Sequence, residues 1–182
     1  MTDTDTINDK ETHLQETPQA SVRDHSTPNE VSELDAPDVG MLPPMRLALF
    51  LIAGITLDWL IPVNFGSGWG WLGLMLIIAA LGFGKWAIQC FKTAGTNVPP
   101  NKPALMIVTD GPFQYTRNPM YISMLSLYAG TAMLADAPLM LLLTAGLWYV
   151  LDRQVIAKEE AYLGAKFGEP YMTYKAKVRR WV

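Results

Sequence analysis

Two clusters of polar residues in this chain of 182 residues have the types and spacing expected of a ligand site. The first is the stretch DGPFQYTRNPMYIS at residues 110–123, where Arg117 and Asn118 directly precede a long apolar run. Arginine offers a planar fork of donors that suits a carboxylate, and asparagine both donates and accepts hydrogen bonds. Pro119 suits the first turn of a following helix. The alternative is that Arg117 is only a basic anchor at a membrane edge and Tyr121 an interfacial aromatic residue.

The second cluster is a pair of adjacent glutamates, Glu159 and Glu160, further along the chain. Ile156, Leu163 and Phe167 recur at helical spacing and form an apolar stripe, and Glu160 lies on that same stripe. Neighbouring residues of a helix point about 100° apart, so the two glutamates are expected to face different surroundings. The alternative is an ordinary solvated acidic pair.

Four apolar segments must position these clusters. They span about residues 46–63, 69–91, 119–135 and 137–155. Each of the first two can form a helix that crosses a bilayer. The last two are expected to form a helical hairpin with short arms, with the turn at ADAP, residues 135–138. A helix from about Pro138 to Phe167 would be roughly 45 Å long and would project beyond the bilayer. The sequence therefore predicts an all-α, multi-pass integral membrane protein with about four transmembrane helices and a C-terminal helical hairpin that extends into the cytoplasm.

Positive charge predicts the orientation of these helices. Lysine and arginine occur in the loop 92–118 and in the C-terminal helix and tail 152–182, whereas the segments around NFGSG and Asp136 have none. By the positive-inside rule, both termini and the loop 92–118 are expected on the cytoplasmic face. That loop is rich in proline, glycine, threonine and asparagine, and we expect an irregular backbone that lines a cavity.

The first forty residues differ in composition from the rest. They hold ten Asp or Glu against Lys10 and Arg23, and no aromatic residue. Such a composition cannot bury enough apolar surface to order the chain, so residues 1–40 are predicted to be a disordered acidic cytoplasmic tail, dispensable up to residue 38, and residues 41–182 the membrane domain. The single cysteine excludes an internal disulfide, and both histidines lie in the tail. We expect no metal site and no nucleic-acid partner.

Taken together, VTDGPFQYTRNPMY and EEAYLGAKFGEPYMTYKAKV resemble motifs of the isoprenylcysteine carboxyl methyltransferase family in its broad sense, which includes phospholipid methyltransferase relatives. The resemblance covers residues 91–182. It implies a membrane enzyme that binds S-adenosylmethionine on the cytoplasmic side, between the motif loop and the C-terminal helix. The methyl acceptor would be lipophilic or small and would enter from the lipid bilayer, as a thiol, an amine, a carboxylate or a lipid headgroup.

The resemblance implies part of the site, namely Leu105 to Val108, Phe113, Asn118 to Tyr121 and Glu159, and the polar clusters and aromatic residues described above suggest the rest. The predicted catalytic residues are Arg117, Glu159 and Glu160, with Glu159 at the reacting end and Glu160 holding its helix against the loop. Lys175 is expected outside the site. The predicted cofactor-binding residues are Leu105, Met106, Ile107, Val108, Gly111, Phe113, Tyr115, Asn118, Pro119, Met120 and Tyr121.

Two positions depart from the family pattern. Asn118 stands where the family commonly has histidine, so the chemistry is not expected to need a histidine base. Val155 stands where the enzymes that methylate prenylated proteins have an arginine, which puts a protein carboxylate in doubt as the acceptor.

Two other classes of function stay open on the residues alone. One is a reductase of the sterol type, which would bind NADPH through a related pocket, and the other is a non-catalytic membrane scaffold. GFGKWA at 82–87 matches a dinucleotide-binding pattern, but it lies inside an apolar helix rather than after a strand. Asp58 and Lys85 lie within or at the edge of the predicted spans, and Lys85 is near enough to an end to extend to the interface.

Overall fold

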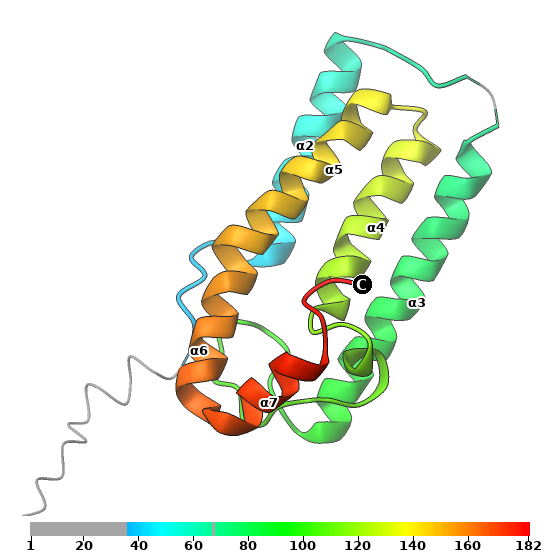
Figure 1. Cartoon of the computed structure of the whole chain (residues 1–182). Helices are drawn as coiled ribbons and strands as arrows, with labels where there is room; N and C mark the ends of the chain where they lie inside the picture. The colour runs from blue at the N-terminus through cyan, green and yellow to red at the C-terminus, as the bar shows by residue number, and fades with distance from the viewer. Residues whose placement is uncertain (1–35, 67) are drawn as a thin grey trace, which may run out of the picture.

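The computed structural model describes residues 36–66 and 68–182, and every regular element in these ranges is a helix. Four of them run alongside one another in a bundle (Figure 1): α2 (Pro43–Leu60), α3 (Gly70–Ala94), α4 (Pro119–Leu134) and α5 (Pro138–Val150). The others gather at the end of the bundle where the C-terminal part of the chain lies: η1 (Gly111–Gln114), η2 (Leu151–Ile156), α6 (Ala157–Phe167) and α7 (Glu169–Lys177).

Three helices in the described part of the chain are long and apolar enough to cross a bilayer: Pro43–Leu60, Gly70–Ala94 and Pro138–Phe167. Large apolar side chains on α2 and α3 point outward, such as Trp59, which is 80 % exposed, as expected for surfaces in contact with lipid. With 16 residues, α4 is shorter than the roughly 20 that a span needs, and it packs between α3 and α5. The chain is therefore an all-α, multi-pass membrane protein, as the sequence predicts.

The helical run that starts at Pro138 continues through η2 and α6 without a break, which agrees with the predicted helix from Pro138 to Phe167. Its 30 residues extend about 45 Å, more than the ~30 Å hydrocarbon core of a bilayer. Its apolar first part, α5 together with η2, is about long enough to cross that core, so its polar last part, α6, with Glu159 and Glu160, extends past it. The π-helical turns of η2 were not predicted.

Close contact between backbones joins α3 to α4. A Cβ atom at Gly73 would lie 2.5 Å from the carbonyl oxygen of Gly130, and a Cβ atom at Gly130 would lie 2.9 Å from the carbonyl oxygen of Gly73. Small residues at a crossing allow this approach in membranes. On the other side of α4, the fully buried Tyr128 donates a hydrogen bond to the carbonyl of Phe50 in α2, 3.0 Å away.

The segment before α2 belongs to the folded body. Val39 is 2 % exposed and packs in the core, its carbonyl accepts a hydrogen bond from Arg46, and the carbonyl of Asp38 accepts one from the Lys158 ammonium at 2.8 Å. Asp38 and Val39 therefore contact the folded body although they lie on the tail side of the predicted boundary at residue 40, and a deletion of residues 1–38 removes part of this packing. The predicted disorder of the acidic tail, residues 1–35, lies outside the described residues.

Candidate active site

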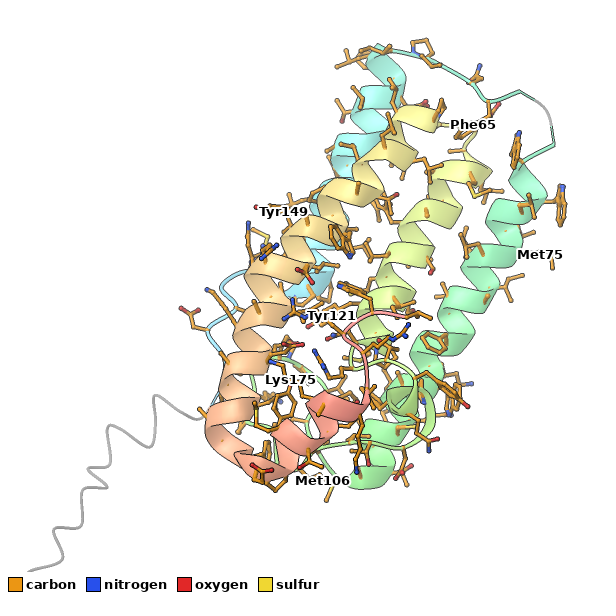
Figure 2. All side chains as sticks on the ribbon, viewed as in Figure 1. Phe65, Met75, Met106, Tyr121, Tyr149 and Lys175 are labelled. Carbon is orange, nitrogen blue, oxygen red and sulfur yellow. The ribbon has the colours of Figure 1, made fainter. Side chains whose placement is uncertain are left out.

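A cavity of about 890 Å³, its opening to solvent included, lies where the α3–α4 loop meets α6 and α7. The long loop and the start of α4 supply most of the wall, and α6 and α7 close it. The lining residues are Pro37, Phe91, Asn97, Val98, Pro99, Pro100, Lys102, Ala104, Met106, Ile107, Val108, Phe113, Arg117, Asn118, Pro119, Met120, Tyr121, Glu159, Glu160, Tyr162, Leu163, Tyr171 and Tyr174. Met106, Tyr121 and Lys175 mark this end of the bundle in Figure 2.

Backbone hydrogen bonds tie the first polar cluster to the C-terminal segment. The Arg117 amide donates to the carbonyl of Arg179 at 2.9 Å, and the Asn118 side-chain amide donates to the carbonyl of Arg180 at 3.0 Å. The Tyr174 hydroxyl donates to the carbonyl of Phe113 at 2.8 Å. Burial raises the pKa of Tyr174 to about 12, so this phenol stays protonated and remains a donor. The chain after α7 thus folds back and fixes the loop that forms the cavity wall.

Glu160 is the centre of a buried cluster of charges. Its side chain is 6 % exposed and accepts hydrogen bonds from Arg117 at 2.6 Å and from Arg180 at 2.7 Å, with the Lys175 ammonium at 3.1 Å. Burial alone would raise the pKa of Glu160, but hydrogen bonds from Arg180, Arg117 and Lys175 outweigh burial and lower the pKa to about 2. The carboxylate is therefore ionised at neutral pH and holds α6 against the loop and α7.

Glu159 lies in different surroundings on the same wall. Its Oε1 atom accepts a hydrogen bond from the Tyr121 hydroxyl at 2.5 Å. Burial raises the pKa of Glu159 to about 7, the Tyr121 hydrogen bond opposes that rise, and the neighbouring Glu160 charge adds to it. Both glutamates thus line the cavity, but cations neutralise Glu160, whereas the pKa of Glu159 lies near neutral.

Most of the predicted site residues lie on this cavity. The cavity lining includes Met106, Ile107, Val108, Phe113, Arg117, Asn118, Pro119, Met120, Tyr121, Glu159 and Glu160. Three predicted cofactor-binding residues are absent from the lining. Leu105 and Tyr115 point outward, 62 % and 68 % exposed, because the irregular loop turns these side chains away from the wall. Gly111 forms a turn with φ of 60° and packs against Cys90 and Trp86, where an added Cβ would lie 2.7 Å from the cysteine sulfur.

The terminal guanidinium nitrogens of Arg117 are used within the protein rather than directed to a ligand. Its Nη2 donates to Glu160, and its Nη1 donates to the carbonyls of Lys175 and Val178 at 2.9 and 2.8 Å. Its buried Nε is left without a hydrogen-bond partner in the described structure. The protein itself thus occupies both terminal nitrogens of Arg117, so in this arrangement they are not free to hold a ligand carboxylate.

Several residues of the charged cluster were missed from the sequence. Lys175 does not line the cavity, and the pairing of its ammonium with Glu160 was not predicted. Arg180 joins Glu160 to the buried Asp152, 3.2 Å away, and the Trp181 indole also donates to Asp152 at 2.9 Å. The sequence could have indicated that Asp152 has a partner, since an acidic residue at the end of an apolar span needs one. The sequence spacing, however, does not indicate that the partners are residues 180 and 181.

The wall combines aromatic side chains with one carboxylate that forms no ion pair with any cation in the described part of the chain. Phe113, Tyr121, Tyr171 and Tyr174 supply aromatic surface, and Glu159 supplies the carboxylate. Such a wall suits a ligand that carries both a flat ring and a positive charge. Among the described residues no group of three or more His, Cys, Asp and Glu side chains is arranged to hold a metal ion.

Comparison with known proteins adds the following. A family model described as phospholipid methyltransferase matches residues 69–170, more than half of the chain. The protein-S-isoprenylcysteine O-methyltransferase of Schizosaccharomyces pombe is 37 % identical over 73 residues, which are 40 % of this chain and 31 % of that protein. An uncharacterised protein of Haemophilus influenzae is 54 % identical over 33 residues, 18 % of this chain and 52 % of that protein. The chain thus matches about a third to a half of these relatives, and no solved structure matches it significantly.

Proposed function

Because the chain belongs to the phospholipid methyltransferase family, we propose that it transfers a methyl group from S-adenosylmethionine to a lipophilic or small acceptor. The observation that carries this proposal is the cavity itself. Both polar clusters lie within the family match or at its edge, and they converge on one cavity although they are far apart in sequence.

The residues of the wall fit such a donor. When bound, S-adenosylmethionine supplies a methyl group that its sulfonium already activates for transfer. Phe113 and Tyr174 would stack with or border the adenine, and the Glu159 carboxylate would face the positive charge of the sulfonium or ammonium group. Methyl transfer from a sulfonium relies on alignment and on exclusion of water, which a walled cavity provides.

Glu159 is the proposed residue at the reacting end. The Tyr121 hydrogen bond fixes the orientation of its carboxylate. A carboxyl group with a pKa near neutral can accept a proton from an acceptor at physiological pH. Arg117 and Glu160 act as positioning residues, because their charges are satisfied by each other and by the C-terminal segment.

The acceptor would be a thiol, an amine or a lipid headgroup rather than a protein carboxylate. Val155, which stands where the protein-methylating enzymes have an arginine, is fully buried in the apolar core and cannot contact an acceptor. The cavity lies at the end of a bundle with lipid-facing helices, so an acceptor could enter from the bilayer side.

Titration calorimetry on detergent-purified protein tests the proposal. The wild type should bind S-adenosylmethionine, and Glu159→Gln should lose on the order of 1.5–3 kcal/mol of binding, roughly ten- to a hundredfold in affinity. The control is Lys177→Gln, which removes an exposed charge outside the cavity lining and should bind like wild type. Binding of NADPH in place of S-adenosylmethionine would replace the proposal with the reductase, and binding of neither would favour a scaffold.

We further propose that the cavity and both termini face the cytoplasm, since the basic residues gather at this end. Single cysteines at Asn64 and at Thr109, both exposed, in a Cys90→Ala background test the orientation. An impermeant thiol reagent applied to intact cells should label the cysteine at position 64 and spare the one at 109. The opposite labelling pattern would invert the topology.

A further inference from the structure

A second hollow lies between α3 and α4, away from the cavity. Six α3 residues and Ser123 of α4 line it, and none of them lines the cavity described above. Gly84 lets the two helices approach closely beside this hollow, because a Cβ atom there would lie 2.5 Å from the Ser123 hydroxyl oxygen. The Ser123 hydroxyl in turn donates to the carbonyl of Ala80 at 2.6 Å, which keeps the two helices close. We call this hollow the α3–α4 groove.

Two lysines and a glutamine share one edge of the α3–α4 groove. Lys85 and Lys92 are seven residues apart, so they lie on the same face of α3 about 10.5 Å apart along the axis, with Gln89 between them. All three side chains are exposed. Neither lysine ammonium has a hydrogen bond or ion pair within the described part of the chain, whereas Lys175 pairs with Glu160. Among these residues, two positive charges at the groove are therefore not neutralised.

The α3–α4 groove lies near the end of α3, which places these two charges near the membrane interface. With 25 residues, α3 is longer than the roughly 20 that cross a bilayer, and Lys92 lies in its last turn. Lys85 is two turns deeper, where an ammonium without a partner is costly. Exposed Leu81 and Ile88 continue the same groove with apolar surface. The groove thus presents a basic part near the membrane interface next to an apolar part, on a lipid-facing helix.

We propose that the α3–α4 groove binds an anionic phospholipid. Lys85 and Lys92 contact the phosphate oxygens, Gln89 hydrogen-bonds the headgroup, and an acyl chain lies against Leu81. Basic pockets between membrane helices are suited to such headgroups, and anionic lipids are concentrated in the cytoplasmic leaflet. The lipid in this groove is a bound partner rather than the methyl acceptor, because the groove shares no residue with the cavity. The proposal stands independently of methyl transfer.

Native mass spectrometry of the full chain in an uncharged detergent tests the proposal, with dioctanoyl phosphatidylglycerol, dioctanoyl phosphatidylcholine and inorganic phosphate as probes. Wild type should retain phosphatidylglycerol in preference to phosphatidylcholine. Lys85→Gln with Lys92→Gln should weaken retention about tenfold or more, because two charge-assisted contacts are lost. Lys85→Arg with Lys92→Arg should keep it.

The matched control is Lys177→Gln with Arg179→Gln, which removes the same charge from exposed positions outside both hollows and should bind like wild type. If the double glutamine variant is unstable, each single variant should weaken retention severalfold. Equal retention by the glutamine variant and wild type, or equal binding of the two lipids, overturns the proposal. Displacement of the lipid by an equal concentration of inorganic phosphate would also overturn it, because the site would then recognise a free ion.

Discussion

The two ends of the helical bundle are held together in different ways. In the membrane half, α3 and α4 meet through Gly73 and Gly130, and the core consists of apolar residues such as Met140 and Leu147. At the cavity end, Glu160 and Asp152 are buried among cations from three separate parts of the chain. The stability of the membrane half therefore depends on close packing, and that of the cavity end depends on the pairing of buried charges.

This difference indicates where the protein is most sensitive. Packing faults in a core are relieved in part by small shifts of neighbouring side chains. A buried ion that loses its partner has no such relief, because water cannot reach it. The charge cluster around Glu160 also positions the cavity wall, so it links the stability of the fold to the proposed binding of the donor.

The largest effect is expected at Glu160. Glu160→Ala leaves Arg117 and Arg180 facing one another without an anion between them, and should cost on the order of 3–5 kcal/mol of unfolding free energy. Denaturant unfolding in detergent measures the loss. Glu169→Gln, at an exposed position on α7, is the control and should change stability little. A loss at Glu160 no greater than at Glu169 would contradict the role assigned to the charge cluster.

A smaller effect is expected in the membrane half. Gly73→Ala places a Cβ atom 2.5 Å from two backbone atoms of α4, which cannot move aside as a side chain could, and should cost about 1–3 kcal/mol. Gly82→Ala on the same helix meets nothing within 4 Å and should be neutral or stabilising. Thermal unfolding of the two variants in one detergent compares them. Similar midpoints would show that α3 and α4 are not held by close backbone contact.

The difference between the membrane half and the cavity end also explains which features could be predicted from the sequence. Long apolar runs bounded by proline and glycine predicted the helices to within a few residues, including the continuous run from Pro138 to Phe167. Periodicity also predicted that Glu160 faces inward, because apolar residues at helical spacing share its stripe. These features depend on neighbours within one helix.

The details of the cavity end could not be predicted in the same way. The pairing of Glu160 with Arg180 and Lys175, and of Asp152 with Trp181, joins segments whose approach depends on the turn at Gly168. Which loop side chains face the wall depends on an irregular backbone, so it could not be predicted that Leu105 and Tyr115 point away from the cavity. Val39 was missed because its neighbours before residue 36 are strongly polar.

The smallest expected effect is a pH dependence of stability that differs between the two adjacent glutamates. Burial raises the pKa of Glu159 from 4.5 to about 7, so its contribution to stability is fully present below about pH 4.5 and is lost as the pH rises through 7. The lowered pKa of Glu160 acts in the opposite sense, since its contribution is present above pH 4.5 and is lost only as the pH falls toward 2. Between pH 5 and 8, only Glu159 of this pair changes charge.

The unfolding free energy of the wild type, relative to that of Glu159→Gln, should therefore fall as the pH rises from 5 to 8. Glutamine cannot ionise, so the variant lacks this dependence, and both proteins share every other titrating group, including the histidines of the tail. Binding of a positively charged donor should change in the opposite direction, strengthening over the same range as Glu159 ionises. Unfolding curves and titration calorimetry at matched pH values measure the two trends. Parallel pH profiles for wild type and variant in both measurements would show that Glu159 is not the titrating group that faces the cavity.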